Sequence, residues 1–290
     1  MDQAERLRAL VREKLDKPQE MPGRSISIYT IASGKGGVGK TSVAVNLAIA
    51  LQQRGKRVLI IDADLGMANV DVMLGLLPRY TLYDVVAHGR LLRDTILTGP
   101  YDMKILPGGS GIMELATLDV EQHKSISEQF LTLEGIDTIF IDTAAGISKN
   151  LLSFIAFSHE LILVTSPEPT AITDAYSVIK VLAQYGLKKN IKVIVNRSVS
   201  LELARTTFEN LNKTTDTFLH TRLESLGCIP DDPKVVQAVM VQEPFLLQYP
   251  GCPASRSINE IADRLIGMPG SRSRIQSIKE VYSRLVKVFS

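Results

Sequence analysis

A glycine-rich loop with two lysines is the part of this sequence best suited to chemistry. Residues 34 to 41 read GKGGVGKT, which places Lys35 and Lys40 in one loop. The pattern G-x-x-x-x-G-K-[ST] is typical of a phosphate-binding loop, because its glycines let successive backbone N–H groups turn toward phosphate oxygens. The loop follows a run of strand formers and opens a helix-forming run, TSVAVNLAIAL, whose positive dipole end favours an anion. The stretch therefore predicts a nucleotide site.

Each residue of this loop has an expected task. We expect Lys40 to reach the β- and γ-phosphates and Thr41 to offer a hydroxyl to Mg²⁺. The early lysine, Lys35, is not expected to contact the same phosphates as Lys40, so we expect it to stabilise negative charge on a nucleotide held elsewhere. The expected nucleotide-binding residues of the loop and helix start are Gly34, Lys35, Gly36, Gly37, Val38, Gly39, Lys40, Thr41 and Ser42.

Three aspartates follow apolar runs elsewhere in the chain. VLIIDAD ends in Asp62 and Asp64, and TIFIDTAAG contains Asp142. Ligands of α/β sheets bind at the carboxyl ends of the strands, where such side chains would gather. We expect Asp142 to order Mg²⁺ through its water shell and one of Asp62 and Asp64 to position the attacking water. Phosphoryl transfer depends mainly on positioning and charge stabilisation, so these groups suffice for hydrolysis.

The elements that must position these residues alternate between strand and helix from residue 25 onward. Strands are predicted at SISIYTIAS, RVLIIDAD, DMKILPGG, DTIFIDTA, ELILVTS, IKVIVNR and ESLGCIP. Helices are predicted after Lys40 and near 120–133, 171–185, 233–242 and 254–266. Short Ile- and Val-rich runs separated by helices indicate an α/β fold, a mostly parallel, doubly wound sheet flanked by helices. Residues 25–270 are predicted to form this domain.

Both ends of the chain carry a separate piece. Residues 1–17 have apolar side chains at helical spacing, and the linker at 18–24 contains prolines and a glycine. Residues 271–290 follow a Gly/Pro break, and residues 274–289 within them combine an apolar stripe with four basic side chains. This C-terminal helix could pack on the domain or lie in an anionic membrane interface. The stripe consists of Ile275, Ile278, Val281, Tyr282, Leu285 and Phe289.

Composition excludes several classes of protein. The chain has 290 residues, 45% of them hydrophobic, and a net charge of +2, which gives no sign of a nucleic-acid binder. Its apolar stretches are shorter than the roughly 18 residues that span a bilayer. The N-terminus lacks the apolar region of a secretory signal, so a cytoplasmic protein is expected. Cys228 and Cys252 have no metal-ligand spacing, and we expect them to be reduced thiols.

The loop with its early lysine, KGGVGKT, resembles the deviant Walker A motif of the MinD/ParA ATPases. KRVLIIDADLGMANVDVMLGL resembles the MinD-type switch I region, and IDTAAGI resembles switch II. The resemblance implies a P-loop ATPase that uses ATP and Mg²⁺, yields ADP, and forms a face-to-face homodimer when ATP is bound. It implies that Lys35 reaches the partner's ATP, as an arginine finger does in other NTPases.

The same resemblance assigns the remaining site residues. It implies that Asp64 positions the water and that Asp62 and Asp142 support the metal. The stretches VNR and IPDD resemble the adenine-reading elements of the family. Their residues are Asn196, Pro230 and Asp231.

The N-terminal stretch DQAERLR is similar to a motif of the flagellar-number regulators in the MinD-like group, called FlhG, FleN or YlxH. The likeness implies that Asp2, Gln3, Leu7 and Arg8 stimulate the SRP-type GTPase FlhF, with the glutamine implicated. It also implies flagellar C-ring partners and reversible attachment to the inner face of the bacterial membrane through the C-terminal helix.

Two related functions stay open as alternatives. A ParA-type DNA-segregation ATPase needs a basic surface on its dimer, which the near-neutral charge does not favour. A MinD-type division-site protein would lack the Asp2 to Arg8 segment and its linker. Nitrogenase-type electron carriers share the lysine loop but need cluster-ligating cysteines, and none lies near the predicted switch II.

Overall fold

A computed structural model describes residues 26–64, 69–108, 111–114, 118, 120–130, 133, 135–187, 190–267 and 278–289. The predicted N-terminal helix, with Asp2, Gln3, Leu7 and Arg8, lies outside the described residues, as do its linker and Ile275. The side chains of Leu285 and Phe289 are also outside the description. Predictions that concern these residues stay predictions.

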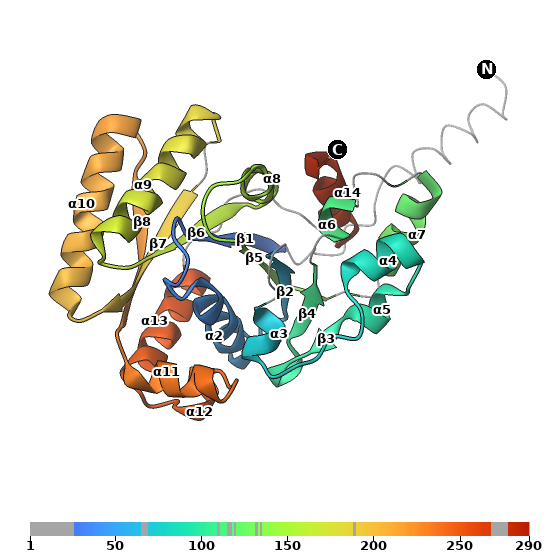
Figure 1. Cartoon of the computed structure of the whole chain (residues 1–290), viewed down its shortest axis with the longest axis horizontal. Coiled ribbons are helices and arrows are strands. Elements are labelled where there is room, and N and C mark those ends of the chain that lie inside the picture. The colour runs from blue at the N-terminus through green and yellow to red at the C-terminus, as the bar shows by residue number, and fades with distance from the viewer. Residues whose placement is uncertain are drawn as a thin grey trace, which may run out of the picture.

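The centre of the structure is a sheet of eight strands in the order β3-β4-β2-β5-β1-β6-β7-β8 (Figure 1). Among the described pairings, only β3 with β4 is antiparallel. Strands β2, β5 and β6 are buried along their whole length, as expected when helices cover both faces of a parallel sheet. The predicted fold class is confirmed. The strands are β1 (Ser27–Ala32), β2 (Val58–Ala63), β3 (Leu97–Thr98), β4 (Lys104–Pro107), β5 (Thr138–Thr143), β6 (Glu160–Thr165), β7 (Asn190–Ser198) and β8 (Leu223–Pro230).

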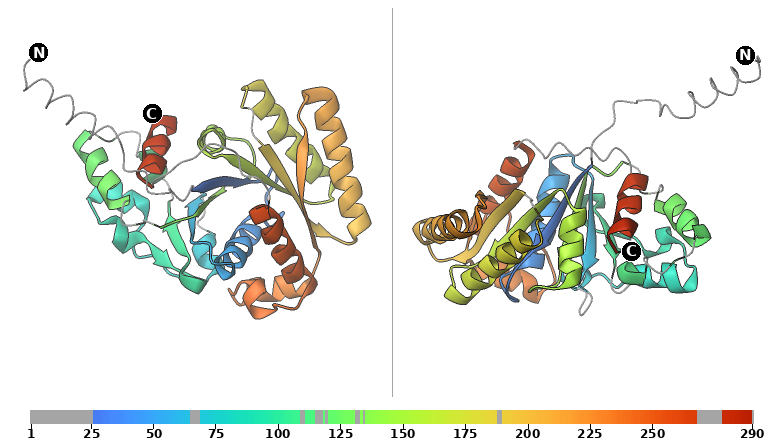
Figure 2. Two further views of the ribbon diagram at one scale, coloured as in Figure 1. Left: turned by 180° about the vertical axis from the view of Figure 1, so that it is seen from behind. Right: turned by 90° about the horizontal axis from the view of Figure 1, so that it is seen from above.

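Helices cover the sheet in two layers (Figures 1 and 2). One layer packs on the face formed by residues such as Ile31 and Ile60, and consists of α2 (Lys40–Gln53), α3 (Val70–Met73), α11 (Pro233–Met240), α12 (Phe245–Gln248) and α13 (Pro253–Gly267). The other layer contains α4 (Leu82–His88), α5 (Leu92–Thr95), α6 (Gly111–Glu114), α7 (Val120–Phe130), α8 (Lys149–Phe157), α9 (Pro169–Gln184), α10 (Leu201–Leu219) and α14 (Ile278–Phe289). A 3₁₀ turn, η1 (Pro100–Asp102), precedes β4.

The C-terminal helix α14 is docked on the domain. Figure 2 shows it beside α7, and its apolar face packs on both α7 and α8. Ile278, Val281 and Tyr282 are at most 4% exposed and belong to the core cluster under this layer. The Tyr282 ring lies 5.1 Å from that of Phe130, between centroids. The three described residues of the predicted membrane-binding stripe are therefore covered in this conformation, packed in the core cluster that α7 and α8 also line.

Across the described part of the chain, no helix is both long enough and apolar enough to cross a membrane.

Candidate active site

The glycine-rich loop connects the end of β1 to the start of α2. Gly37 and Gly39 have φ values of 81° and 86°, which residues with a side chain rarely adopt. Gly34 also has no room for a side chain, since an added Cβ would lie 2.3 Å from the backbone of α9. Helix α2 begins at Lys40 without a side-chain cap, so a capping side chain does not occupy its first N–H groups. Such a helix start is suited to an anion.

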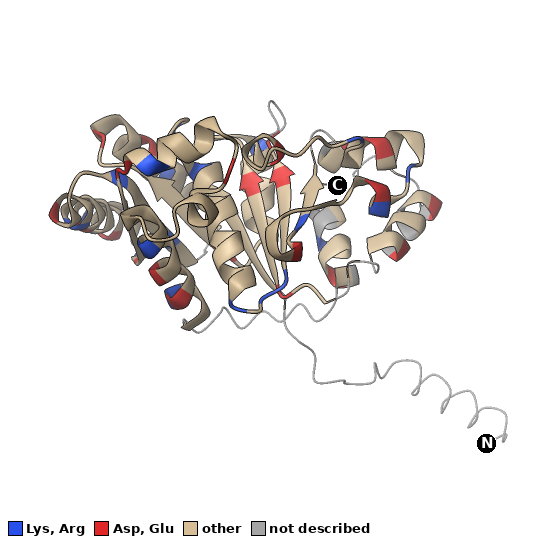
Figure 3. Cartoon of the chain, turned by 90° about the horizontal axis from the view of Figure 1, so that it is seen from below, with Lys and Arg blue, Asp and Glu red and all other residues tan. Residues whose placement is uncertain are grey.

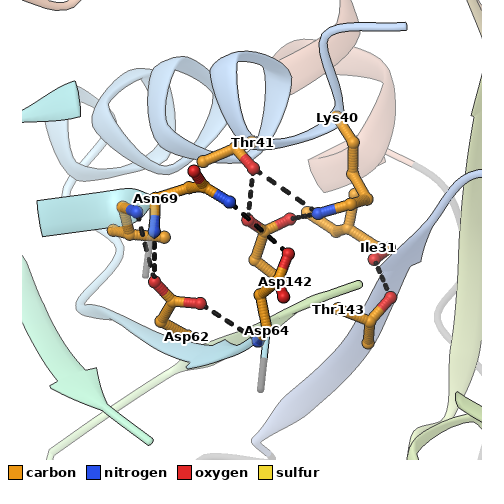
Figure 4. Close-up of polar contacts among 9 residues, drawn as sticks. Ile31, Lys40, Thr41, Asp62, Asp64, Asn69, Asp142 and Thr143 are labelled. Atoms are coloured by element: carbon orange, nitrogen blue, oxygen red, sulfur yellow. Dashed lines mark hydrogen bonds and ion pairs between the residues drawn. The ribbon is translucent and has the colours of Figure 1, made fainter. Parts of the chain in front are cut away.

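Lys40 and Thr41 both converge on Asp142 (Figure 4). The Nζ of Lys40 donates to Oδ1 of Asp142 at 2.7 Å, and the Thr41 hydroxyl donates to Oδ2 at 2.7 Å. Asp142 is fully buried and Lys40 is 7% exposed. Burial raises the pKa of Asp142, against the opposing effect of Lys40 and the hydrogen bonds to Lys40 and Thr41. The basic residue, the hydroxyl and the carboxylate predicted from separate motifs thus form one cluster.

Asp62 lies beside Asp142 because β2 and β5 pair with these two residues in register. Acidic residues colour the tips of two adjacent central strands in Figure 3. The carboxylate of Asp62 accepts N–H bonds from Asn69 at 3.0 Å and Val70 at 3.2 Å, so it caps α3. Burial, and then the charge of Asp142, raise the pKa of Asp62 to about 6. Asp62 therefore links the carboxylate cluster to the segment that follows β2.

Asp64 stands one residue beyond the end of β2 and completes the cluster. Its backbone N–H donates to Oδ1 of Asp62 at 3.1 Å, and its carboxylate accepts a bond from Nδ2 of Asn69 at 3.4 Å (Figure 4). Its charge contributes to the raised pKa of Asp142. All three predicted aspartates therefore face one another at the carboxyl edge of the sheet.

Lys35 lies at the rim of the loop and contacts the start of α9. Its Nζ is 2.9 Å from Oε2 of Glu168 and 2.9 Å from the hydroxyl of Thr170. The hydrogen bond from Lys35, followed by its charge, holds the pKa of Glu168 below its usual value. The Lys35 side chain is 38% exposed, so this ion pair is open to solvent.

The predicted adenine-reading residues lie at the ends of β7 and β8. Nδ2 of Asn196 donates to the carbonyl of Val38 in the glycine-rich loop at 2.7 Å. Pro230 ends β8, and the N–H of Asp231 donates to the carbonyl of Ser198 at 3.0 Å. The two loops are thus joined to each other and to the phosphate loop. Ser42 is buried in the first turn of α2.

Sequence reasoning missed four residues around this site. Glu168 and Thr170, which hold Lys35, follow a strand without any charge pattern that marks them. Arg197, near the end of β7, donates to the carbonyl of Gly37 at 3.4 Å; it belongs to the VNR stretch, but nothing in that stretch indicates a contact with the phosphate loop. Asp232 caps α11 by accepting from the N–H of Lys234 at 2.9 Å, and the Asp-Pro pair at the helix start could have predicted it.

A parallel sheet with a phosphate-type loop after a central strand and carboxylates on neighbouring strands defines a P-loop nucleotide hydrolase. Residues 29–245 match the family described as CobQ/CobB/MinD/ParA nucleotide binding domain. The chain therefore belongs to this family, and it is a MinD-like ATPase.

Three known proteins illustrate the similarity. The chain is 40% identical over 245 residues to the antiactivator FleN of Pseudomonas aeruginosa, covering 84% of this chain and 88% of that one. It is 30% identical over 294 residues to the flagellum site-determining protein YlxH of Helicobacter pylori, covering 99% and 98%. The solved structure of the septum site-determining protein MinD complexed with Mg-ADP, from Pyrococcus horikoshii, matches with a TM-score of 0.65 and 30% identity, covering 83% and 96%.

Proposed function

We propose that the glycine-rich loop and the three aspartates bind and hydrolyse ATP with Mg²⁺. The observation that carries this assignment is the convergence of Lys40 and Thr41 on buried Asp142. The Thr41 hydroxyl and the carboxylates of Asp62 and Asp142 are hard oxygen donors of the kind that Mg²⁺ prefers. Among the described residues, no three side chains form a metal cage alone, which suits a cation that shares its shell with phosphates and water. Bound Mg²⁺ would neutralise charge on the phosphates.

The other charged residues of the site then have defined tasks. Lys40 contacts the β- and γ-phosphates, and Asp64 orients the attacking water in line with the bond that breaks. Lys35 serves the nucleotide of a second copy of the chain in an ATP-bound homodimer. To do so it exchanges Glu168 and Thr170 for that nucleotide, and the exchange costs little because both partners of this ion pair are open to solvent.

Asn196 gives a reason for adenine rather than guanine. One hydrogen of its Nδ2 is bound to the carbonyl of Val38, and its Oδ1 is the side chain's acceptor for a base. Adenine presents an amino donor at position 6, and guanine presents a carbonyl acceptor there. An oxygen of Asn196 therefore favours adenine. Pro230 and Asp231 complete the base site from the loop after β8.

The cellular role that fits best is regulation of flagellar number and placement. The similarity to YlxH extends over 99% of the chain, so it includes both terminal segments, and the similarity to FleN is 40% over the domain. Under this proposal ATP hydrolysis is a switch between a dimer and a monomer. The N-terminal segment with Gln3 stimulates the SRP-type GTPase FlhF, and components of the flagellar C-ring are further partners.

Membrane attachment under this proposal requires α14 to leave its contacts with α7 and α8. Its buried residues, Ile278, Val281 and Tyr282, are the same ones that would enter the lipid interface. The basic side chain of Arg284 on the same helix is exposed enough to meet anionic headgroups. The docked form is then the cytoplasmic form, and the released form binds the inner face of the membrane.

GTP hydrolysis by the purified SRP-type GTPase tests the cellular role. The full chain should stimulate hydrolysis, the Gln3→Ala variant should lose that effect, and Gln19→Ala in the linker should keep it. If the full chain and both variants stimulate equally, the assignment of Gln3 is wrong. If a folded, ATP-hydrolysing chain gives no stimulation, a MinD-type or ParA-type role becomes the better assignment.

A further inference from the structure

We propose that Arg197 is a positioning residue that, with Asn196, holds the phosphate loop in its binding conformation through the carbonyl groups of Gly37 and Val38. The proposal rests on the nucleotide site assigned above and gives a role to Arg197, the residue of the VNR stretch to which the sequence analysis assigned none. Three observations carry it: the contacts of Arg197, its backbone conformation and the geometry of the peptide groups that it holds.

Two consecutive residues at the end of β7 bind two consecutive carbonyl groups of the loop. Nδ2 of Asn196 donates to the carbonyl of Val38 at 2.7 Å, and Nη1 of Arg197 donates to the carbonyl of Gly37 at 3.4 Å. Asn196 is 7% exposed and anchors the pair, while the Arg197 side chain is 53% exposed. The contacts run from strand to loop, far apart in sequence, so both are tertiary.

The backbone at Arg197 is arranged to make this possible. Consecutive side chains of a strand point to opposite faces, so two neighbours cannot normally reach one loop. Arg197 has a φ of 57°, and the register of β7 against β8 shifts between Val195 and Ser198. This left-handed turn brings the second side chain to the same loop as the first. Residues other than glycine adopt such a conformation rarely, and it persists where the surrounding structure favours it.

The peptide groups of the loop explain what the two contacts achieve. A trans peptide places its carbonyl and its N–H on opposite sides. When Arg197 binds the carbonyl of Gly37, the N–H of Val38 points away from Arg197. When Asn196 binds the carbonyl of Val38, the N–H of Gly39 points away in the same manner. Successive N–H groups aimed to one side form the anion-binding concavity that phosphate oxygens require.

Arg197 also connects the phosphate loop to the base site. Its Nε lies 3.7 Å from Oδ1 of Asp231, in the loop after β8. Its charge adds to the effect of Lys35, which is the larger one, in lowering the pKa of Glu168. Arg197 thus stands among three loops that meet at the nucleotide, and its loss should loosen the phosphate loop before ATP binds.

The test uses glycine, because glycine removes the side chain and also relieves the backbone conformation. In the full chain, Arg197→Gly should raise the KM for ATP about ten-fold and leave kcat within about two-fold, since bound phosphates hold the loop once the site is saturated. Arg197→Ala should raise KM similarly. The urea midpoint of ligand-free Arg197→Gly should not fall, because a glycine fits φ of 57° without strain.

His220→Gly is the matched control. His220 ends α10 with a φ of 51° and is exposed, so the change relieves a similar conformation away from the site. This variant should keep both KM and kcat. The proposal is overturned if both Arg197 variants keep a KM within about two-fold of the original chain. Lys40→Ala distinguishes failure of this proposal from failure of the proposed nucleotide site. If that variant still binds ATP normally in calorimetry, the nucleotide site itself is misassigned.

Discussion

Shortening Phe130 to alanine should release α14 and increase membrane binding without changing α14 itself. Phe130 is 2% exposed on α7, and its ring lies 5.1 Å from that of Tyr282. An aromatic pair of this kind contributes about 1 kcal/mol beyond the area that it buries. Truncating a buried phenylalanine lowers the free energy of unfolding by about 3–5 kcal/mol, and part of this loss comes from weaker packing against α14. The ratio of docked to released helix should therefore fall by at least about five-fold.

Sedimentation of the full chain with anionic liposomes measures this release. The original chain should bind weakly without nucleotide and more strongly with ATP, because two helices in a dimer bind together. Phe130→Ala should bind more strongly than the original chain in both conditions. The control is Phe245→Ala, which creates a similar cavity in the opposite layer, where Phe245 is 3% exposed and packs with α2 and α13.

The comparison of these two variants decides whether docking controls attachment. If Phe130→Ala is folded by circular dichroism and sediments like the original chain without nucleotide, the docked helix does not limit membrane binding. If Phe245→Ala gains the same binding, the gain reflects general loss of stability. Removal of residues 271–290 should abolish sedimentation in every case, and a truncated chain that still sediments would place the membrane contact elsewhere.

Four further predictions concern the site and the core. Lys35→Ala should retain ATP binding but lose dimerisation and turnover, measured by light scattering and phosphate release. Asp64→Ala should trap the ATP-bound dimer, and rapid turnover in that variant would show that another carboxylate positions the water. Lys192→Met should lower the free energy of unfolding, measured in urea, by about 3–5 kcal/mol, because the buried carboxylate of Glu160 loses the ammonium group 3.4 Å away. The double variant Lys192→Met/Glu160→Gln should recover most of the lost stability, because it no longer buries an unpaired charge. The pKa of Asp62 is raised from 3.8 to about 6 in the folded state, so between these two pH values the folded chain binds more protons than the unfolded chain. The contribution of Asp62 to the free energy of unfolding therefore falls as the pH rises from about 3.8 to about 6. Asp62→Asn should remove this pH dependence, measured by urea unfolding at several pH values.

The positions of the site residues could be predicted because they depend on local pattern and sheet register. Asp62 and Asp142 each end an apolar run, and parallel strands of similar length bring such ends together. The loop from Gly34 to Thr41 carries its own signal, since Gly34 has no room for a side chain and Gly37 and Gly39 have positive φ values that other residues rarely adopt. The residues of the protein that hold Lys35 could not be predicted. The contacts of Lys35 with Glu168 and Thr170 join segments more than a hundred residues apart, and single charges have no pattern.

Helices α10 and α8 were not predicted from the sequence, and each omission has a physical reason. In α10 the buried positions are Ala204, Thr207, Leu211 and Thr215, which follow helical spacing. Two of them are threonines, which are polar, β-branched and weak helix formers, so the sequence does not show a clear apolar stripe at helical spacing. Their hydroxyls bond to carbonyls one turn earlier, as that of Thr207 does with Leu203 at 2.7 Å. In α8 the run LLSFIAF is apolar apart from Ser153, and a short run of that kind cannot be distinguished from a buried strand.

The position of α8 suggests how the site and α14 act together. Asp142 lies near the end of β5, just before the segment that leads to α8. Ser148 caps α8 by accepting from the N–H of Leu151 at 3.1 Å. The same segment is tied to the phosphate loop, since the N–H of Gly146 donates to the carbonyl of Ser33 at 2.9 Å. A nucleotide that draws Asp142 or Ser33 into new contacts must therefore strain or shift the start of α8. Because α14 packs on α8, we expect nucleotide binding to change how firmly the C-terminal helix is held.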